Sequence, residues 1–430
     1  MIRGVSVALA CFWLIAPGVG WAGPGEPSPR GLPGPPHQAW YPRAPGLPKP
    51  AGPVIRAANV RELFAAAGQV PPGGTILVAD GHYLLTACLD LHTDNVTLRS
   101  ESGQRDRVVL DGSGPLGELV SVTRCSGATI ADLTIQNAKW NGFKVNSDKG
   151  QGVRRLTICN CVIHNIWQRG VKGPRVPPEN REALRPADCR VQYCLFYNDR
   201  PKRPSDDEAD EQNHFGGNYV GGMDIMCAGR WTICDNVFVG IQGRTREGRG
   251  AIFLWVDTRD CLVQRNVIID CDCGICLGNS FRGPGEAVHC TRCTVRNNFV
   301  AACPENGILA DYTRDCKIVH NTIHDPASRM QRLIRVVHDN PGLVVANNLL
   351  SGKAMQIETQ SPIRLEGNVI RDLTAALVGP GEGNLRLRAE AAAALPTVSR
   401  LDDAPQDIDG HPRPPKTLPG AHQPPSSSGE

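Results

Sequence analysis

The segment Leu-Thr-Ile-Cys-Asn-Cys-Val-Ile, residues 156–163, returns in altered form through most of the chain. Trp-Thr-Ile-Cys-Asp-Asn-Val-Phe occupies residues 231–238, Thr-Val-Arg-Asn-Asn-Phe-Val residues 294–300, and Lys-Ile-Val-His-Asn-Thr-Ile residues 317–323. Each copy reads as a short apolar strand, a polar turn and a second apolar strand. A repeat of this length is typical of a solenoid, in which each copy packs only on its neighbours. We therefore expect one long repeat array rather than several globular domains.

Alignment of the copies gives one column that is Asn or Cys in nearly every repeat. Its members are Leu133, Cys161, Cys194, Asn236, Asn266, Asn298, Asn321, Asn348 and Asn368. Stacked Asn side chains can hydrogen-bond along a solenoid and can satisfy the backbone of the turns. We therefore expect this column to face the interior.

A second column lies five residues before the first and is mostly apolar. Its members are Ala128, Leu156, Cys189, Trp231, Cys261, Cys293, Cys316, Leu343 and Ile363. Because Cys alternates there with Leu, Ile and Trp, it is predicted to fill the interior as a small apolar residue. Cysteines on adjacent turns would nevertheless lie near disulfide distance, and the sequence assigns no pairing among the 17 cysteines.

The ends of the chain differ in composition from the repeat. Residues 1–22 are typical of a secretory signal peptide, which predicts a secreted, periplasmic or cell-surface protein, and their apolar run is too short to span a membrane. Residues 23–55 are rich in Pro and Gly and predict a linker. We expect the solenoid, with a covering helix at residues 57–67, over residues 56–375, a closing segment over 376–415 and a disordered tail over 416–430. The formal net charge of +3 gives no reason to expect a nucleic-acid partner, and we expect a monomer.

The repeat, the Val-Thr-Leu-Arg-Ser strand at residues 96–100, the Asp111-Gly112 turn and the covering helix resemble the right-handed parallel β-helix superfamily. That superfamily includes pectate-lyase-like, chondroitinase-like and alginate-lyase-like enzymes. The phrase Asp-Ile-Asp-Gly-His-Pro-Arg at residues 407–413 is similar to a closing segment of many secreted bacterial β-helices. The resemblance implies an all-β fold, a right-handed parallel β-helix (solenoid) with an N-terminal capping helix. It implies no single activity, because one fold hosts many chemistries.

A third column indicates where function would lie. The second strand of a repeat usually opens with Gly, as in Gly-Phe-Lys-Val at residues 142–145, and its third residue is expected to point outward. Lys144, Lys172 and Asp224 would then share one outer face, about 5 Å apart from strand to strand. The loops 174–188 and 199–221 interrupt the repeat beside these strands and are expected to wall a cleft.

This face suits an acidic polysaccharide. Eliminative cleavage needs a base beside a uronic carboxylate and positive charge to neutralise that carboxylate. Lys172 would be the base if cationic neighbours lower its affinity for a proton, and Arg169 or Arg249 would hold the carboxylate. The predicted catalytic set is Lys172, Arg169, Arg249 and Asp224, and the predicted substrate-binding set is Lys144, His214, Trp255, Asn279 and Asp311.

Three alternatives remain open from the sequence. A glycoside hydrolase would use Asp224 with Asp311 or a loop acid as paired carboxylates. A non-catalytic surface or adhesive protein would bind glycans or other partners through the same face. In the third, Lys144 and Lys172 are solvated residues of a polar exterior. We expect no cofactor, although the acidic run of Asp206, Asp207, Glu208, Asp210 and Glu211 could hold Ca²⁺ if it is not a solvated loop of mixed charge.

Overall fold

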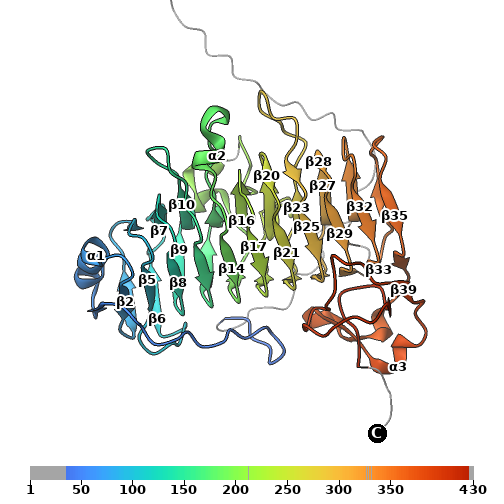
Figure 1. Ribbon diagram of the computed structural model, residues 1–430, viewed down its shortest axis with the longest axis horizontal. Coiled ribbons are helices and arrows are strands. Elements are labelled where there is room, and N and C mark those ends of the chain that lie inside the picture. Colours follow the sequence, from blue (N-terminus) through green and yellow to red (C-terminus); the bar gives the residue numbers. More distant parts are fainter. Residues whose placement is uncertain (1–34, 212, 326, 328, 331, 426–430) are drawn as a thin grey trace, which may run out of the picture. The chain divides into compact units, whose positions relative to one another are not determined.

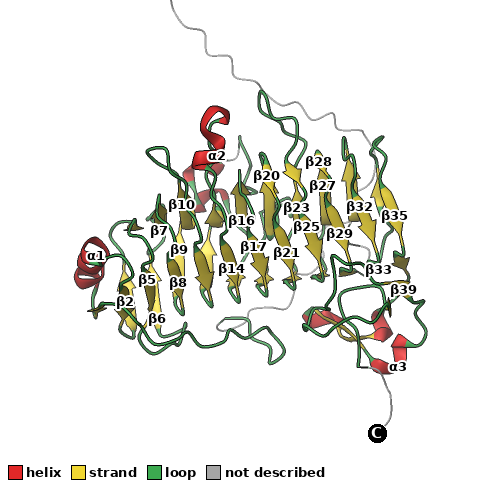
Figure 2. Ribbon diagram, viewed as in Figure 1, coloured by secondary structure: helices red, strands yellow, loops and turns green. Residues whose placement is uncertain are grey.

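The computed structural model describes residues 35–425, apart from residues 212, 326, 328 and 331. The predicted signal peptide and the first part of the linker lie outside the described residues. In the described part, short strands stack into three parallel sheets, and each successive coil adds one strand to each sheet (Figure 1). Helices are few and short (Figure 2). The expected all-β, right-handed parallel β-helix is confirmed.

Sheet A is the first strand of each coil. Its strands, in spatial order, are β1 (Val54–Ala57), β2 (Thr75–Val78), β5 (Thr97–Ser100), β8 (Thr129–Ala131), β11 (Thr157–Cys159), β14 (Arg190–Gln192), β17 (Thr232–Cys234), β21 (Leu262–Gln264), β25 (Thr294–Arg296), β29 (Lys317–Val319), β32 (Val344–Ala346) and β35 (Arg364–Glu366).

Sheet B follows sheet A in each coil. Its strands are β3 (Gly81–Leu84), β6 (Val108–Asp111), β9 (Thr134–Ala138), β12 (Val162–Ile166), β15 (Leu195–Tyr197), β18 (Val237–Val239), β22 (Val267–Ile269), β26 (Phe299–Ala301), β30 (Thr322–His324), β33 (Leu349–Ser351) and β36 (Val369–Ile370).

Sheet C completes each coil. Its strands are β4 (Leu89–Leu91), β7 (Glu118–Thr123), β10 (Asn141–Asn146), β13 (Arg169–Lys172), β16 (Gly221–Met226), β19 (Ile252–Trp255), β23 (Cys273–Leu277), β27 (Asn306–Asp311), β31 (Arg332–Val337) and β34 (Gln356–Ile357). A short fourth ladder, β20 (Thr258–Arg259), β24 (Cys290–Thr291) and β28 (Thr313–Arg314), runs along the return from sheet C to sheet A.

The predicted Asn/Cys column forms a continuous hydrogen-bonded ladder at the turn between sheets A and B. The side-chain oxygen of Asn266, for example, accepts from the backbone N–H of Asn236 at 3.1 Å, while the backbone N–H of Asn266 donates to the Asn298 side chain at 3.0 Å. The residue just before each column position has a positive φ, such as 52° at Asn297 and 56° at Asn347. This tight turn leaves backbone groups inside the coil, and the Asn side chains satisfy them.

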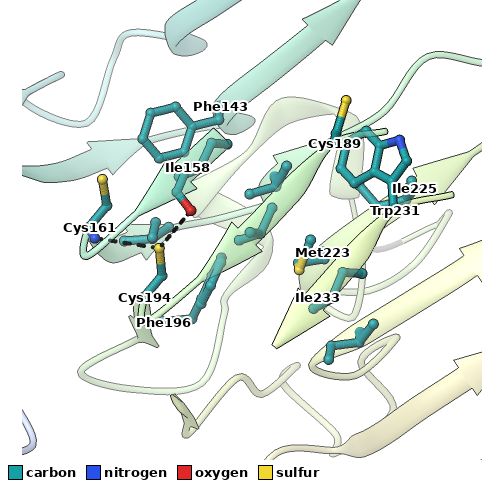
Figure 3. Packing of buried hydrophobic residues seen from close by; sticks show 14 of the residues in the cluster. Phe143, Ile158, Cys161, Cys189, Cys194, Phe196, Met223, Ile225, Trp231 and Ile233 are labelled. Atoms are coloured by element: carbon teal, nitrogen blue, oxygen red, sulfur yellow. Dashed lines mark hydrogen bonds between the residues drawn. The ribbon is translucent and has the colours of Figure 1, made fainter. Parts of the chain in front are cut away.

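The second column lies in the apolar core, as predicted. Cys189 is next to Trp231 in Figure 3, and both side chains are fully buried. Burial raises the pKa of the Cys189 thiol to about 12, so this thiol stays protonated. All 16 described cysteines are free, and among them only Cys88 is not fully buried. Cysteine thus acts as a small apolar residue here, without a disulfide in the described part of the chain.

Helix α1 (Val60–Gln69) covers the first coil and begins later than the predicted residues 57–67. Asn59 caps it by accepting from the backbone N–H of Glu62 at 3.0 Å, and Glu62 accepts from Ala58 in return at 2.8 Å. This capping box fixes the start of the helix. The preceding residues instead form strand β1, which pairs with β2, so the predicted linker ends before Val54.

The segment after β36 packs along the outer face of sheet B. It contains the pairs β37 (Leu377–Gly379) with β38 (Asn384–Leu387) and β39 (Val398–Ser399) with β40 (Lys416–Thr417), and helix α3 (Ala389–Ala392). Leu385, Leu387 and Leu418 join the outward side chains of sheet B in one apolar cluster. Arg413 is buried and donates to Asn297 and to the carbonyl oxygen of Gly420. The predicted disordered tail is therefore wrong for residues 416–425, because this cluster and Arg413 hold them. Within the described residues, no helix is long and apolar enough to cross a membrane.

Candidate functional site

The third predicted column is present on the outer face of sheet C. Lys144 pairs in register with Lys172, and Lys172 pairs with Asp224. The next positions are Phe253, Cys276, Leu309 and Arg335. The column is therefore charged over three neighbouring strands, β10, β13 and β16, and apolar over the three strands that follow them.

Asp224 is the centre of this charged stretch. Its side chain is buried and accepts from Lys172 Nζ at 2.5 Å, Arg169 Nε at 3.0 Å and Trp255 Nε1 at 2.7 Å. The structure therefore brings together four of the predicted residues, Lys172, Arg169, Asp224 and Trp255. We call these four residues the Asp224 cluster.

Two ion pairs keep Asp224 charged despite its burial. Burial alone would raise its pKa, but Lys172 and Arg169 outweigh burial and hold the pKa of Asp224 below its usual value. The nearest ionisable partner of Lys172 is thus a carboxylate, and not the cations that the sequence-based interpretation placed beside it. The condition under which the sequence made Lys172 a general base, cationic neighbours alone, is therefore not met at this site.

The exposed fractions of the cationic side chains show which of them can contact a polymer on the surface. The Arg169 side chain is 2% exposed, whereas those of Lys172 and Lys144 are 16% and 26% exposed. Arg169 therefore cannot reach a polymer on the surface, and it serves to orient Asp224. Lys144 lies one strand away and donates to Glu118 at 2.9 Å, so it forms a second, more accessible ion pair beside the cluster.

The inserted loop 198–220 is fixed at the start of the sheet C strands by a buried lysine. Lys202 is fully buried and donates to Asp207 at 2.8 Å, and its Nζ lies 2.9 Å from Asp210 and from the carbonyl oxygen of Tyr219. Asp207 also accepts from Trp140 and Gln168, which precede β10 and β13. The loop is therefore clamped to the two strands that carry the lysines.

This arrangement corrects the prediction of a solvated mixed-charge loop. The charges are paired, but Lys202, Asp207 and Asp210 are all buried. It also bears on the predicted Ca²⁺ ligands, because the ammonium group already occupies the space between the two carboxylates. The residues present therefore do not fit a Ca²⁺ ion at that position.

The same loop places aromatic rings against the Asp224 cluster. The Arg169 guanidinium lies 4.1 Å from the centre of the Tyr219 ring, and the Phe215 ring stacks on that of Tyr219 with their centres 4.7 Å apart. Phe215 is exposed, and the predicted ligand His214 beside it is exposed and paired with Glu211 at 2.9 Å. An exposed ring stacked on Tyr219 offers a flat apolar face beside the charged cluster.

The loop 173–189 lies at the opposite ends of the same strands. It contains η1 (Pro178–Asn180) and helix α2 (Arg181–Leu184). Ser147, just after β10, donates to the carbonyl oxygen of Leu184 at 2.6 Å, and Arg185 donates to that of Asp257 at 2.6 Å. The two inserted loops therefore flank the charged stretch of sheet C from both strand ends, as predicted.

Arg249 stands on a third loop, residues 240–250, and its side chain is exposed. Asp272 anchors this loop by accepting from the backbone N–H groups of Gly243 and Gly248, both at 2.7 Å. Burial raises the pKa of Asp272 to about 7, although these two N–H groups and Arg246 partly oppose that rise. A buried carboxyl that titrates near neutrality thus holds the loop that carries Arg249.

The raised pKa of Asp272 predicts a pH-dependent stability. The pKa of Asp272 is near 4 in the unfolded chain and about 7 in the folded chain. Between these two pH values the folded chain binds more protons than the unfolded chain, so stability falls as pH rises. Asp272→Asn removes this dependence and keeps an acceptor for both N–H groups. As the pH rises from 5 to 8, the free energy of unfolding of the variant should increase by about 2–3 kcal/mol relative to that of the wild type. Urea unfolding measures this difference. A stability difference between variant and wild type that stays constant across this pH range would contradict the assignment. The control is Asp106→Asn, at an exposed position.

The remaining predicted residues lie away from the cluster. Asp311 is on β27, three strands from Asp224, and pairs with His338 at 2.8 Å. Three strand spacings amount to about 14 Å, which exceeds the roughly 5–10 Å between the paired carboxylates of glycosidases. Asn279 is buried, and its carbonyl oxygen lies 3.0 Å from His289. The expected Asp224–Asp311 pair is therefore not assembled.

Sequence reasoning missed several residues around the site. Lys202 and Tyr219 lie in a loop that no repeat position predicts, so the sequence holds no register signal for them. His338 could have been predicted from the register. Asp311 and Val337 are register partners on adjacent strands, so the residues that follow them, Tyr312 and His338, are neighbours as well. Its imidazole stacks on Tyr312 at 4.6 Å.

Comparisons with known proteins agree with this architecture. A family model described as "Right handed beta helix region" matches residues 193–370. The solved structure of pectate lyase Pel9A is similar, with a TM-score of 0.51 and 12% identity over 84% of this chain and 90% of that chain. No curated protein matches the chain.

Two further structures show weaker likeness. The alginate lyase from Paenibacillus sp. str. FPU-7 has a TM-score of 0.43 and 15% identity over 74% of this chain and 99% of that chain. The A-module of mannuronan C-5 epimerase AlgE4 from Azotobacter vinelandii has a TM-score of 0.43 and 13% identity over 75% and 94%. The chain is a right-handed parallel β-helix protein. At these identities the likeness concerns the fold.

Proposed function

We propose that this protein binds an acidic polysaccharide along the outer face of sheet C and cleaves it by β-elimination at the Asp224 cluster. The observation that carries the proposal is the cluster itself. A buried carboxylate gathers Lys172, Arg169 and Trp255 between two inserted loops. Such a set of fixed charges beside exposed aromatic surface suits a charged, ring-shaped substrate.

The accessible cations would neutralise the uronic carboxylate. Lys144 and Lys172 lie on adjacent strands, and Arg249 is exposed on the loop that Asp272 anchors. Positive charge at the carboxylate stabilises the carbanion that forms when the neighbouring C–H proton is removed. A water molecule at the exposed face takes the C–H proton, and the ammonium group of Lys172, which is bonded to Asp224, donates a proton to the leaving oxygen as the C–O bond breaks. The proton on that water then restores the Lys172 ammonium group, so the step balances.

The β-helix fold itself supports a carbohydrate-acting protein only in general terms. Pectate lyase Pel9A, whose structure is similar to this chain at a TM-score of 0.51, is by its name a polysaccharide lyase. A binding protein without catalysis would use the same face, and release of unsaturated product by the wild type separates the two functions. The hydrolase alternative that pairs Asp224 with Asp311 lacks its carboxylate pair, because these two residues are three strands apart.

Substitution of Lys172 tests both the activity and its site. We expect the wild type to release unsaturated product from uronate polymers, detected by ultraviolet absorbance, and Lys172→Ala to lower kcat by about 10²–10⁴-fold, the range of a proton-transferring group. Lys172→Arg should retain binding but not turnover, because the guanidinium keeps its proton.

The control is Lys49→Ala, which removes an exposed lysine outside the solenoid. Wild-type binding without any product across the polymer panel would leave the glycan-binding alternative as the function. Full activity in Lys172→Ala would move catalysis away from the Asp224 cluster. The absence of both binding and product would reject the polysaccharide proposal.

A further inference from the structure

In the part of the chain that the structure describes, no element covers the apolar core at the C-terminal end of the solenoid. Leu365, Ile370 and Ile357 belong to the last strand of each sheet and are 46%, 44% and 37% exposed. Their register partners on the preceding coil, Val345, Leu350 and Val336, are each 0% exposed. The inward-facing side chains of the last coil are therefore uncovered by the described residues.

The backbone of this coil is open as well. Among the described residues, strands β34, β35 and β36 each pair with one neighbour and end their sheets. Figure 1 shows β35 at this end of the coil. The segment that follows packs on the outer face of sheet B instead of on these strands. At the N-terminal end, by contrast, α1 buries Leu63 and Ala66 against the first coil. Three open strand edges around an exposed apolar patch are a template for pairing with another chain.

The charges on β35 fit a second copy of this chain. The strand reads Arg364-Leu365-Glu366, with Arg364 and Glu366 exposed on its outer side. An antiparallel pair of two such strands, centred on Leu365, places each Arg364 opposite the Glu366 of the other copy. It also places the two Leu365 side chains together on the core side, because directly opposite residues share a face. The strand is therefore self-complementary under a two-fold axis.

The same axis fits the other two edges. A two-fold axis through the middle of β35 exchanges sheets B and C between the copies, so β34 of one copy faces β36 of the other. That exchange brings Ile357 against Ile370, both exposed in the single chain. An isologous contact of this kind closes on itself and yields a dimer rather than a filament.

We propose that two copies of this protein associate end to end through β34, β35 and β36, with the two β35 strands antiparallel. This inference is independent of the proposed polysaccharide activity and replaces the expectation of a monomer. It continues the parallel sheets of each copy into the other and buries Leu365, Ile357 and Ile370.

The test is the molar mass of the purified chain by light scattering after size exclusion, together with sedimentation equilibrium. We expect twice the monomer mass for wild type. Glu366→Arg creates two like-charge contacts across the axis and should weaken the dimer about tenfold or more. Arg364→Glu should do the same, and the double variant Arg364→Glu/Glu366→Arg should restore wild-type association.

Leu365→Asp places two carboxylates together at the centre and should give a monomer. These side chains are exposed in the single chain, so the variants should fold, which circular dichroism checks. Phe281→Asp, at a more exposed apolar residue outside β34, β35 and β36, should stay dimeric. A monomeric wild type at its highest soluble concentration, or a dimer that Glu366→Arg and Leu365→Asp both leave intact, overturns the proposal.

Discussion

Lys202→Met is expected to lower the free energy of unfolding by about 3–5 kcal/mol, because it leaves two buried carboxylates without their counter-ion. Asp207 and Asp210 both contact the Lys202 ammonium group and are themselves buried. Removal of one partner of a buried ion pair costs far more than the pair contributes, since the remaining charge stays in a site of low polarity. Urea unfolding of the variant and the wild type measures this loss.

The control for this prediction contacts the same loop. Lys139 pairs with Glu208 at 2.7 Å, but the Glu208 side chain is 81% exposed. Lys139→Met should therefore change stability by less than about 1 kcal/mol. Equal effects of the two substitutions would contradict the assignment of Lys202 as the buried anchor of the loop.

A smaller substitution separates the roles of charge and volume. Lys202→Ala empties the space between two carboxylates and the Tyr219 carbonyl oxygen, an all-oxygen set of the kind that Ca²⁺ accepts. We expect Ca²⁺ to restore part of the stability of Lys202→Ala and to leave wild type and Lys202→Met unchanged. Lack of any Ca²⁺ effect on Lys202→Ala would mean that these oxygens cannot replace the ammonium group with an ion.

The repeat made the interior predictable. Asn266, Asn298 and Cys189 recur at fixed register positions, and a residue in register must meet the same surroundings as its counterpart one coil away. The same logic placed Lys144, Lys172 and Asp224 on adjacent strands, as observed. Periodicity thus predicts which residues are neighbours, and it does so for outward as well as inward side chains.

The contacts of the inserted loops could not be predicted in this way. Tyr219 and Lys202 lie in a loop without register. Nothing in the sequence therefore indicates that the Tyr219 ring contacts the Arg169 guanidinium, or that the buried Lys202 donates to the carbonyl oxygen of Tyr219. The pairing of Lys172 could not be predicted for a related reason. Register gave its distance from Asp224, but only the side-chain geometry shows that Asp224 is the shared partner of Lys172, Arg169 and Trp255. Register therefore predicts position, whereas burial and pairing depend on contacts between loops.

Asp224→Ala is expected to cost about 3–5 kcal/mol in stability and to abolish the proposed activity, because Arg169 then remains buried without a carboxylate. Lys172 is partly exposed and can turn to solvent, but Arg169 cannot. The double variant Arg169→Met/Asp224→Leu replaces the buried pair by apolar side chains of similar size. It should recover most of the lost stability without recovering activity.

This contrast distinguishes a structural ion pair from a functional one. Asp188→Ala is the matched control, since it breaks the exposed pair of Asp188 with Arg230 and should cost less than about 1 kcal/mol. The low pKa of Asp224 adds a pH signature: its stabilising effect is present above the unfolded-state pKa near 4 and is lost as pH falls through the folded-state value. Wild type should therefore lose more stability in acid than the double variant. If the double variant is as unstable as Asp224→Ala, burial of Arg169 is not the source of the cost, and if it keeps full activity, Asp224 does not position the reacting lysine.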